Sequence, residues 1–320
     1  MPIVESDYTG SRWVRNRHLQ TILPVLFDYL KANYTRERIV LDDGDFLDLD
    51  WMYTNSSRVL ILFHGLEGSS QSHYMKALAN FANKLNWNVC AVNFRSCSGE
   101  MNRKLQSYHS GATADVHEVI KHILEQKPFN KLAAAGFSLG GNVLLKYLGE
   151  QIYTTAARIT RAAAVSVPVH LADCSAELAK SHNQIYLNRF LKSLKRKMND
   201  KSRQFPGSVD ANRLNNLRNL AEFDQYFTAP IHGFIDAAEY YSRCSSLQFL
   251  ADIKRPVLLI NALNDPFLTA SCYPSHIAQQ STNLYLETPK HGGHVGFTLH
   301  HLSSKNWLNH RIMTFISDKE

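Results

Sequence analysis

The sequence lacks any apolar run near the roughly 20 residues that a membrane-spanning helix needs. Its first twenty residues show no basic segment followed by an apolar one and a small-residue cleavage site, so we expect no secretory signal. Cysteine is scarce, with five scattered residues and no CxxC pair. Neither a disulfide framework nor a zinc site is indicated, and free thiols favour a reducing compartment, the cytoplasm.

Nucleic-acid-binding motifs are also missing: there is no zinc finger, no RNP-like aromatic motif and no long basic tail. The net charge of +7 and the pI near 9.1 are compatible with anionic partners, but charge alone is weak support for nucleic acid, and we predict none. The 320 residues, 44% of them hydrophobic, suffice for one large α/β domain with an insertion or for two ordinary domains. No pattern specifies an oligomeric state.

Apolar runs alternate with segments at helical spacing along most of the chain. Such alternation predicts a largely parallel sheet covered by helices on both faces, with its sites at the carboxyl ends of the strands. Alternating residues around Asp-Asp-Gly-Asp predict a β-hairpin over 36–53. The expected strands are 58–65, 87–95, 131–138, 162–169, 255–262 and 283–289, and the expected helices are 73–86, 113–126 and the segment after Ser138.

The alternation stops between residues 168 and 254, where the sequence is helical and strongly basic. An insertion of this size between two strands is most simply a cap over the active site. Within it, the expected helix over 183–198 has two faces. The apolar face comprises Ile185, Leu187, Leu191, Leu194 and Met198, and the basic face Arg189, Lys192, Lys195, Arg196 and Lys197. Such a helix suits either a packed surface or peripheral contact with an anionic membrane.

The stretch GFSLG, residues 136–140, places a serine between two glycines where a strand gives way to a helix. Gly and Ser are common in ordinary turns at such junctions. The same pattern, GxSxG, forms the nucleophile elbow of acyl-transfer enzymes, in which a tight turn exposes the serine hydroxyl. Its position after a buried strand favours Ser138 as a nucleophile.

A serine nucleophile needs a histidine base and an orienting carboxylate, and both follow in the required order. Asp265 comes just after the strand expected over 255–262, whereas Asp252 precedes that strand and Glu287 lies within the last one. The glycine-rich loop HGGHVGF offers two histidines. We favour His294, which follows two glycines, with His291 as the alternative.

Acyl transfer also needs N–H donors for the oxyanion. The residue after the nucleophile is Leu139, and the loop after an earlier strand supplies Leu66. His64, beside this loop, is interpreted as structural rather than as a base.

A series of motifs resembles the α/β-hydrolases, and more narrowly the YheT-like subfamily, whose relatives include membrane-associated animal lipases. The motifs are RNRHLQTILP, HGLEGSS, NFRSCSGE, YHSGATADV, GFSLGGNVLLKYLGE, YFTAPIHGFIDAAEYY and HGGHVGF. The family often has Gly where this chain has Ser96. The resemblance implies an eight-stranded, mostly parallel sheet, a triad of Ser138, Asp265 and His294, and carboxylic-ester hydrolysis. It also makes HLQTIL an arm that packs on the body and YFTAPIHGF a part of the acyl pocket, with His18, Arg95 and His232 as further candidates.

The sequence therefore predicts an α/β-hydrolase fold with core segments 1–167 and 255–320 and a helical cap over 168–254. We expect a serine carboxylesterase that acts on a small-molecule or lipid ester without metal or organic cofactor. Two alternatives stay open: a thioesterase, amidase or acyltransferase with the same site, and a non-catalytic binding protein of the same fold.

Overall fold

The computed structural model describes residues 3–10, 14–297 and 307–317, and its centre is a nine-stranded sheet of order β1-β9-β8-β7-β6-β4-β5-β3-β2. β3 is antiparallel to β2 and β5, and all other neighbours are parallel. The ends of the expected core segments, 1–2 and 318–320, and the stretches 11–13 and 298–306 lie outside the described residues. The strands are β1 (Ile3–Val4), β2 (Thr35–Val40), β3 (Phe46–Met52), β4 (Arg58–Phe63), β5 (Asn88–Asn93), β6 (Lys131–Phe137), β7 (Ile159–Val165), β8 (Val257–Ile260) and β9 (Leu284–Glu287).

The sheet has one strand more than the family resemblance implied. The additional strand is β1, whose Ile3 and Val4 pair in parallel with Leu286 and Glu287 of β9. Two residues are too few to show a strand periodicity, so the sequence gives no sign of it. The expected hairpin is confirmed as β2 and β3. β7 begins earlier than the expected 162–169, and it ends at Val165 because Ser166 has a φ of +54°, outside the strand region.

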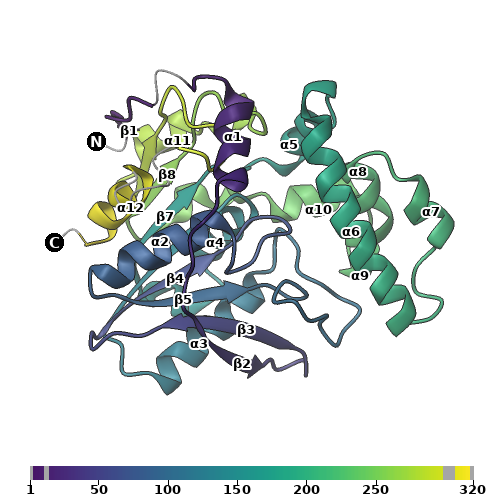
Figure 1. The fold of residues 1–320 in the computed structure, drawn as a ribbon, viewed down its shortest axis with the longest axis horizontal. Coiled ribbons are helices and arrows are strands. Elements are labelled where there is room, and N and C mark those ends of the chain that lie inside the picture. Colours follow the sequence, from purple (N-terminus) through teal and green to yellow (C-terminus); the bar gives the residue numbers. More distant parts are fainter. Residues whose placement is uncertain (1–2, 11–13, 298–306, 318–320) are drawn as a thin grey trace.

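Helices cover both faces of the sheet, as the sequence predicts (Figure 1). Successive side chains of β4 point to opposite faces: Ile61 packs with α3 and α4, and Leu62 with α2 and α12. The helices of the core are α1 (Arg17–Leu26), α2 (His73–Lys84), α3 (Thr113–Gln126), α4 (Leu139–Gly149), α11 (Ser275–Gln280) and α12 (Trp307–Ser317), with short helical turns η1 (Thr154–Arg158) and η5 (Ala270–Cys272).

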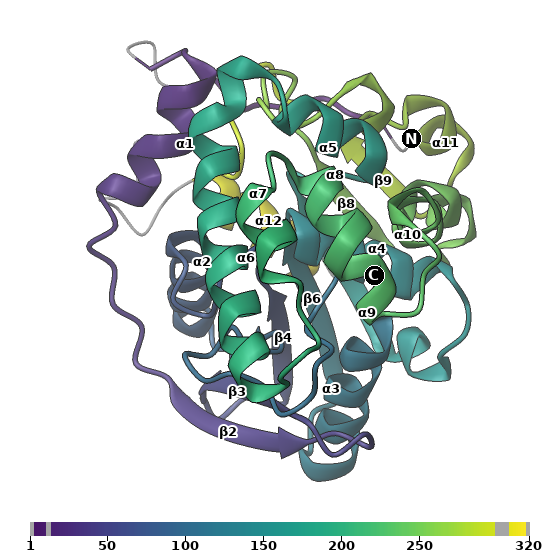
Figure 2. The ribbon, with the colours of Figure 1, turned by 90° about the vertical axis from the view of Figure 1, so that its right-hand side faces the viewer.

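Between β7 and β8 the chain forms a helical insertion that stands to one side of the sheet (Figures 1 and 2). The insertion has an apolar cluster of its own, to which the core contributes Phe267. Its last turn, η4, returns to the core, where Leu250 is fully buried. The elements are α5 (Leu171–Leu178), η2 (Ser181–Asn183), α6 (Gln184–Gln204), α7 (Ala211–Asn216), α8 (Leu220–Phe223), the π-helical turn η3 (Asp224–Thr228), α9 (Ala229–Ile231), α10 (Ala237–Cys244) and η4 (Ser246–Asp252).

The two predicted faces of α6 need two corrections. Ile185 is 65% exposed, because it lies on the opposite side of the helix from Leu187 and Leu191, which are buried. Lys197 was expected on the outer face, but it turns inward and pairs with Glu67 of the core. A helix residue three positions after Leu194 shares its face, so a lysine there faces the core.

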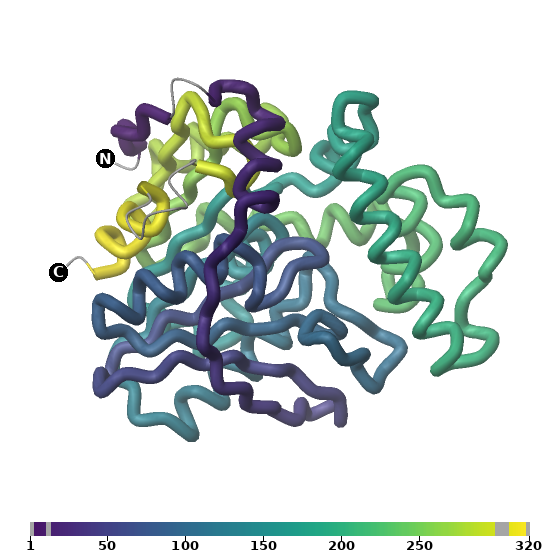
Figure 3. The backbone as a smooth tube through the Cα atoms, in the orientation of Figure 1, coloured from purple at the N-terminus to yellow at the C-terminus, as the bar shows by residue number. Residues whose placement is uncertain are grey.

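The N-terminal segment passes along the outside of the core. Figure 3 shows the chain leaving α1 and running across the helices to the far edge of the sheet, where β2 begins. Trp307 of α12 donates a hydrogen bond to Asp7 at 2.6 Å, so the two ends of the chain are joined.

Candidate active site

Ser138 stands between β6 and α4 in a strained backbone conformation. Its φ of +52° and ψ of −121° lie where residues with a side chain are uncommon. Two backbone hydrogen bonds stabilise the turn. Ser138 N–H donates to the carbonyl oxygen of Val165 at 2.9 Å, and Asn142 N–H donates to the carbonyl oxygen of Ser138 at 3.0 Å. The half-buried hydroxyl therefore stands at the carboxyl edge of the sheet, as expected of a nucleophile elbow.

The two glycines of the GFSLG stretch are required by close backbone approach. A Cβ on Gly136 would come within 2.6 Å of the carbonyl oxygen of Gly140. A Cβ on Gly140 would meet the carbonyl oxygens of Phe63 and His64 at the end of β4. The serine turn is thus pressed against the loop that carries Leu66.

His294 lies between Ser138 and Asp265 and is within hydrogen-bond distance of both. The Oγ of Ser138 is 3.0 Å from Nε2 of His294, and Nδ1 of His294 is 2.8 Å from Oδ2 of Asp265. A carboxylate accepts, so Nδ1 carries the proton and Nε2 is left to accept from the serine. The centroid of the Phe267 ring lies 4.2 Å from that of the His294 imidazole. The backbone N–H of Phe267 donates a hydrogen bond to Oδ1 of Asp265 at 2.9 Å.

The alternatives to these residues lie elsewhere. Glu287 is buried in β9 and accepts a hydrogen bond from Arg311 at 2.7 Å. Asp252 is exposed at the end of η4. Among the described residues, no group hydrogen-bonds to the buried Nδ1 of His291. None of the three joins Ser138.

Helix α1 holds the loop that carries His294, a role that the sequence alone did not assign. Thr21 Oγ1 accepts a hydrogen bond from the backbone N–H of His294 at 2.9 Å. Gln20 Oε1 accepts from Gly292 N–H at 3.0 Å and from the Asn264 side chain at 2.8 Å. Asn264 in turn accepts from Gly293 N–H at 3.0 Å. The motif HLQTIL thus joins the loops of the carboxylate and the imidazole.

The signal for this role is present in the sequence but ambiguous. Gln20 and Thr21 are two adjacent polar residues with apolar neighbours on either side, and both are buried. Buried polar side chains need hydrogen-bond partners, yet spacing does not say which.

Leu66 and Leu139 both line the space in front of Ser138. Within the part of the chain that the structure describes, neither backbone N–H donates to a protein acceptor. A Cβ on Gly65 would lie 3.1 Å from Cβ of Ser138, so the Leu66 loop is directly beside the serine. Two free N–H groups beside a serine hydroxyl are what an oxyanion site requires.

His64 is fully buried and hydrogen-bonds to the backbone of the loop that carries Leu66. Its Nδ1 lies 2.7 Å from the carbonyl oxygen of Gly65, and Phe94 N–H donates to Nε2 at 3.2 Å. These partners assign the proton to Nδ1 in a neutral ring. Burial lowers the pKa of His64 to about 4, so the ring stays neutral at physiological pH.

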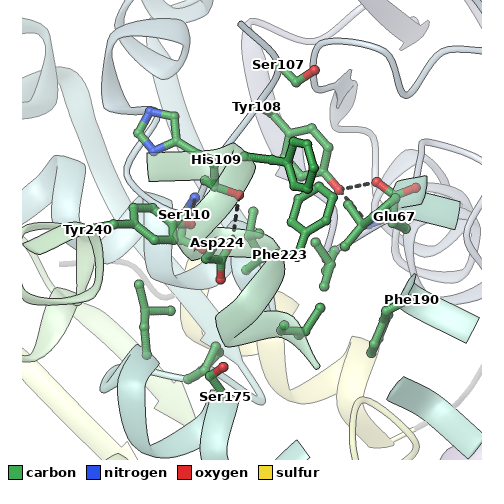
Figure 4. A pocket seen from close by; sticks show the side chains of 18 of the residues that line it. Glu67, Ser107, Tyr108, His109, Ser110, Ser175, Phe190, Phe223, Asp224 and Tyr240 are labelled. Carbon is green, nitrogen blue, oxygen red and sulfur yellow. Dashed lines mark hydrogen bonds between the residues drawn. The ribbon is translucent and has the colours of Figure 1, made fainter. Parts of the chain in front are cut away.

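A pocket lined by Ser138 and His294 extends into the helical insertion. Figure 4 shows part of its lining, including Phe190 and Phe223 of the insertion. Its volume is about 150 Å³. Most of its lining is apolar and comes from the insertion, including Leu171, Leu178, Phe190, Leu194, Phe223 and Phe227. Such a lining suits an apolar group of a ligand held against the serine.

Near Leu66, the pocket wall contains a buried ion pair. Lys197 of α6 donates to Oε1 of Glu67 at 2.9 Å, and the Tyr108 hydroxyl donates to the same oxygen at 2.7 Å (Figure 4). Ser193 donates to the other carboxylate oxygen. Burial alone would raise the pKa of Glu67, but Lys197 and these hydroxyls outweigh burial and hold that pKa below its usual range. The insertion is thereby tied to the residue after Leu66.

Farther from the serine, the pocket carries a second buried carboxyl. Asp224, in the π-helical turn, accepts hydrogen bonds from Thr228 at 2.6 Å and Tyr241 at 2.7 Å. Burial raises the pKa of Asp224 to about 6. π-Helical turns inside helices often occur at functional sites.

The three further candidates lie in different surroundings. Arg95 is held by Asp115, Asp43 and Asp45 in an ion-pair network away from the pocket lining. His18 lies on α1 with its Nδ1 3.1 Å from the Tyr186 hydroxyl. His232 lines the pocket, with its ring 4.4 Å from that of His109. Only His232 shares the cavity with Ser138.

Neither a metal centre nor a membrane span is found in the described ranges. No group of three or more His, Cys, Asp and Glu side chains there is arranged to hold a metal ion. None of the helices described is both long and apolar enough to cross a bilayer.

Comparison with known proteins agrees with the fold. A family model described as "alpha/beta hydrolase fold" matches residues 58–300. The chain is 36% identical to YheT of Escherichia coli (strain K12) over 98% of this chain and 93% of YheT. It is 29% identical to phospholipase ABHD3 of Homo sapiens over 92% of this chain and 75% of that protein. The esterase Pf2001 of Pyrococcus furiosus has the same fold, with a TM-score of 0.60 and 18% identity over 99% of this chain and 97% of that one.

Proposed function

The chain belongs to the α/β-hydrolase family and to its YheT-like branch, and from this premise we propose that it hydrolyses carboxylic esters through Ser138, His294 and Asp265. One observation carries the proposal: the unbroken series of contacts from Ser138 Oγ to His294, at 3.0 Å, and from His294 to Asp265, at 2.8 Å. A serine hydroxyl is a weak nucleophile unless a base takes its proton, and this series supplies the base and its orienting partner.

In the first half of the reaction, Ser138 Oγ attacks the ester carbonyl while Nε2 of His294 takes the hydroxyl proton. The N–H groups of Leu66 and Leu139 stabilise the negative charge that develops on the carbonyl oxygen. The carbon–oxygen bond to the alcohol then breaks, His294 returns the proton to the leaving alkoxide, and an acyl-Ser138 ester remains. Asp265 keeps the imidazole in the tautomer that accepts at Nε2 and stabilises its protonated form.

Water completes the cycle. It enters where the alcohol left, loses a proton to His294 Nε2 and attacks the acyl-Ser138 carbonyl, with the same two N–H groups holding the oxyanion. The serine–acyl bond breaks, Ser138 regains its proton from His294, and the carboxylic acid leaves. The described residues supply every proton transfer in this scheme.

The helical insertion between β7 and β8 is the proposed cap of this site, for which we propose the bounds 168–254. Its apolar side chains would hold the acyl chain of the ester, since they form most of the lining beside Ser138. The names of the relatives support an ester of the lipid class as substrate, phospholipase being the activity named for the human relative. Five buried thiols, all free, support the proposal of a reducing compartment such as the cytoplasm.

The proposal is tested with a fluorophosphonate probe, which reacts with an activated serine. Wild type should be labelled and Ser138→Ala should not. Ser208→Ala is the matched control, because Ser208 is an exposed serine remote from the pocket lining. Equal labelling of wild type and Ser138→Ala would refute the proposal. Turnover of nitrophenyl esters beside the corresponding thioesters then separates esterase from thioesterase action, and labelling without turnover of any acyl substrate would favour a binding protein.

A further inference from the structure

Helix α1 and the residues after it turn polar side chains inward and apolar side chains to solvent. Gln20 and Thr21 are buried against the His294 loop. Leu26 is 66% exposed, Phe27 48% and Tyr29 72%. This is the reverse of an ordinary surface helix, whose apolar stripe faces the core. The exposed large apolar side chains, here termed the α1 apolar face, are Leu19, Val25, Leu26, Phe27 and Tyr29.

Exposed cations lie before and after the α1 apolar face in the chain, and on the neighbouring helix α6. Arg15 precedes the helix and Lys31 follows it, and α6 lies alongside through the contact of His18 with Tyr186 (Figures 1 and 2). α6 adds exposed Arg189, Lys192 and Arg196.

These cations have no acidic partners in the structure. Among the described residues, no carboxylate lies within 4.0 Å of the charged group of Arg15, Lys31, Arg189, Lys192 or Arg196. The acid of this stretch, Asp28, is already paired with Lys76 at 2.7 Å. The surface therefore combines apolar side chains with positive charge that no described carboxylate neutralises.

The α1 apolar face lies next to the pocket. Ile22, on the same helix, packs against the apolar cluster of the insertion together with Leu66 and Phe190. Both of the latter residues line the pocket in front of Ser138. A hydrophobic surface bound to α1 would thus lie beside the cavity in which the ester is proposed to be cleaved.

We propose that the α1 apolar face docks on the surface of an anionic lipid bilayer. Leu26, Phe27 and Tyr29 enter the boundary between headgroups and acyl chains, and the unpaired cations contact lipid phosphates. A second copy of this chain is a poorer occupant, because a two-fold contact through this face would set unpaired cations against one another. The inference rests on the proposed function, for which docking presents lipid esters to the pocket.

The first test asks whether this face enters a bilayer. All five native cysteines are buried, so a cysteine added on the surface takes up a thiol-reactive, polarity-sensitive fluorophore selectively. Leu26→Cys is the reporter, and Ile152→Cys is its control. Ile152 is 68% exposed and follows the end of α4 that is farther from Ser138. Adding vesicles of phosphatidylcholine with phosphatidylglycerol should shift the emission to the blue at position 26 and not at position 152.

The second test removes the apolar side chains. Leu26→Ser/Phe27→Ser should weaken binding to the same vesicles about tenfold or more, because two large side chains no longer leave water. The control Val40→Ser/Ile152→Ser removes two exposed apolar side chains elsewhere and should bind as wild type does. Higher salt, or vesicles of phosphatidylcholine alone, should also weaken binding. Thermal melting checks that both variants fold.

Activity separates this inference from the proposed function. Leu26→Ser/Phe27→Ser should cleave a soluble short-chain ester at the wild-type rate and an ester embedded in vesicles more slowly. No shift at position 26, equal vesicle binding by the variant and wild type, or a dimer that the variant abolishes would each overturn the inference. Failure of wild type to cleave any soluble ester would instead refute the proposed function, while the binding measurements would still decide the docking.

Discussion

The hydroxyl of Thr21 accepts a hydrogen bond from the backbone N–H of His294 at 2.9 Å, across 273 positions of the sequence. Thr21 also donates to the Arg17 carbonyl oxygen at 2.8 Å, so the hydroxyl is fixed within α1. The imidazole of His294 is thus positioned by a helix that contributes no atom to the proposed chemistry.

Removing this hydroxyl should slow the reaction without weakening substrate binding. In Thr21→Val the side chain keeps its shape, but His294 N–H loses its acceptor, and we expect kcat to fall roughly tenfold, or by about 1.4 kcal/mol. Thr21→Ser restores the acceptor and should recover most of the rate. Steady-state kinetics on a nitrophenyl ester checks both variants. A rise in KM with unchanged kcat would contradict a positioning role.

Loss of the Asp265 carboxylate should lower kcat far more than loss of the Asp252 carboxylate. Asp265→Asn can donate to Nδ1 of His294 and so favours the wrong tautomer, for which we expect kcat to fall by roughly 10³ to 10⁴. Asp252→Asn, which changes an exposed acid outside the pocket lining, should leave kcat unchanged. The two rates measured side by side decide the assignment, and equal losses would point to a structural cause.

The buried imidazole of His64 should make stability depend on pH. Its pKa lies at about 4 when folded, against an ordinary value of 6.5, because burial disfavours the charged ring. Below about pH 6.5 the His64 imidazole is protonated in the unfolded chain, whereas in the folded chain it stays neutral down to about pH 4. The free energy of unfolding therefore decreases as pH falls through this window. From about pH 7 to about pH 5 the loss is about 2 kcal/mol for this group.

His64→Gln tests this directly, because it keeps a donor and an acceptor but cannot titrate. Urea unfolding at both pH values should show a smaller loss in the variant than in wild type. The comparison must be between variant and wild type, since Asp224, with its pKa raised to about 6 by burial, favours the folded state as pH falls. Parallel losses in the two proteins would contradict the assignment.

Lys197 and Glu67 should stabilise the folded protein only when both charges are present. Lys197→Met leaves a buried carboxylate without its cation, and we expect a loss of about 3 kcal/mol in the free energy of unfolding. Lys197→Met/Glu67→Gln removes both charges and should recover a large part of that loss. Lys192→Met, on the exposed side of α6, is the matched control. Chemical denaturation measures all four proteins, and a double variant no more stable than Lys197→Met would exclude the coupling.

Sequence was sufficient where structure follows from neighbours along the chain. GFSLG lies between an apolar strand and a helix, and the strained turn at Ser138 is a local consequence of its two glycines. The order of serine, aspartate and histidine after β6, β8 and β9 identified three side chains that the fold brings into contact. Parallel strands bring their carboxyl ends to one edge, so chain order alone predicts proximity there.

Long-range contacts decided the rest. The pairing of β1 with β9, the inward turn of Lys197 toward Glu67, and the attachment of Gln20 and Thr21 to the His294 loop all join residues far apart in the chain. No periodicity reports such partners, because a polar side chain in a helix is equally compatible with solvent and with a buried acceptor. The sequence by itself determined the turn at Ser138 and the chain order of the three proposed catalytic groups, whereas only the tertiary structure decided which face of α1 is buried. There, hydrogen bonds to the histidine loop fix the polar side inward and leave the apolar side exposed.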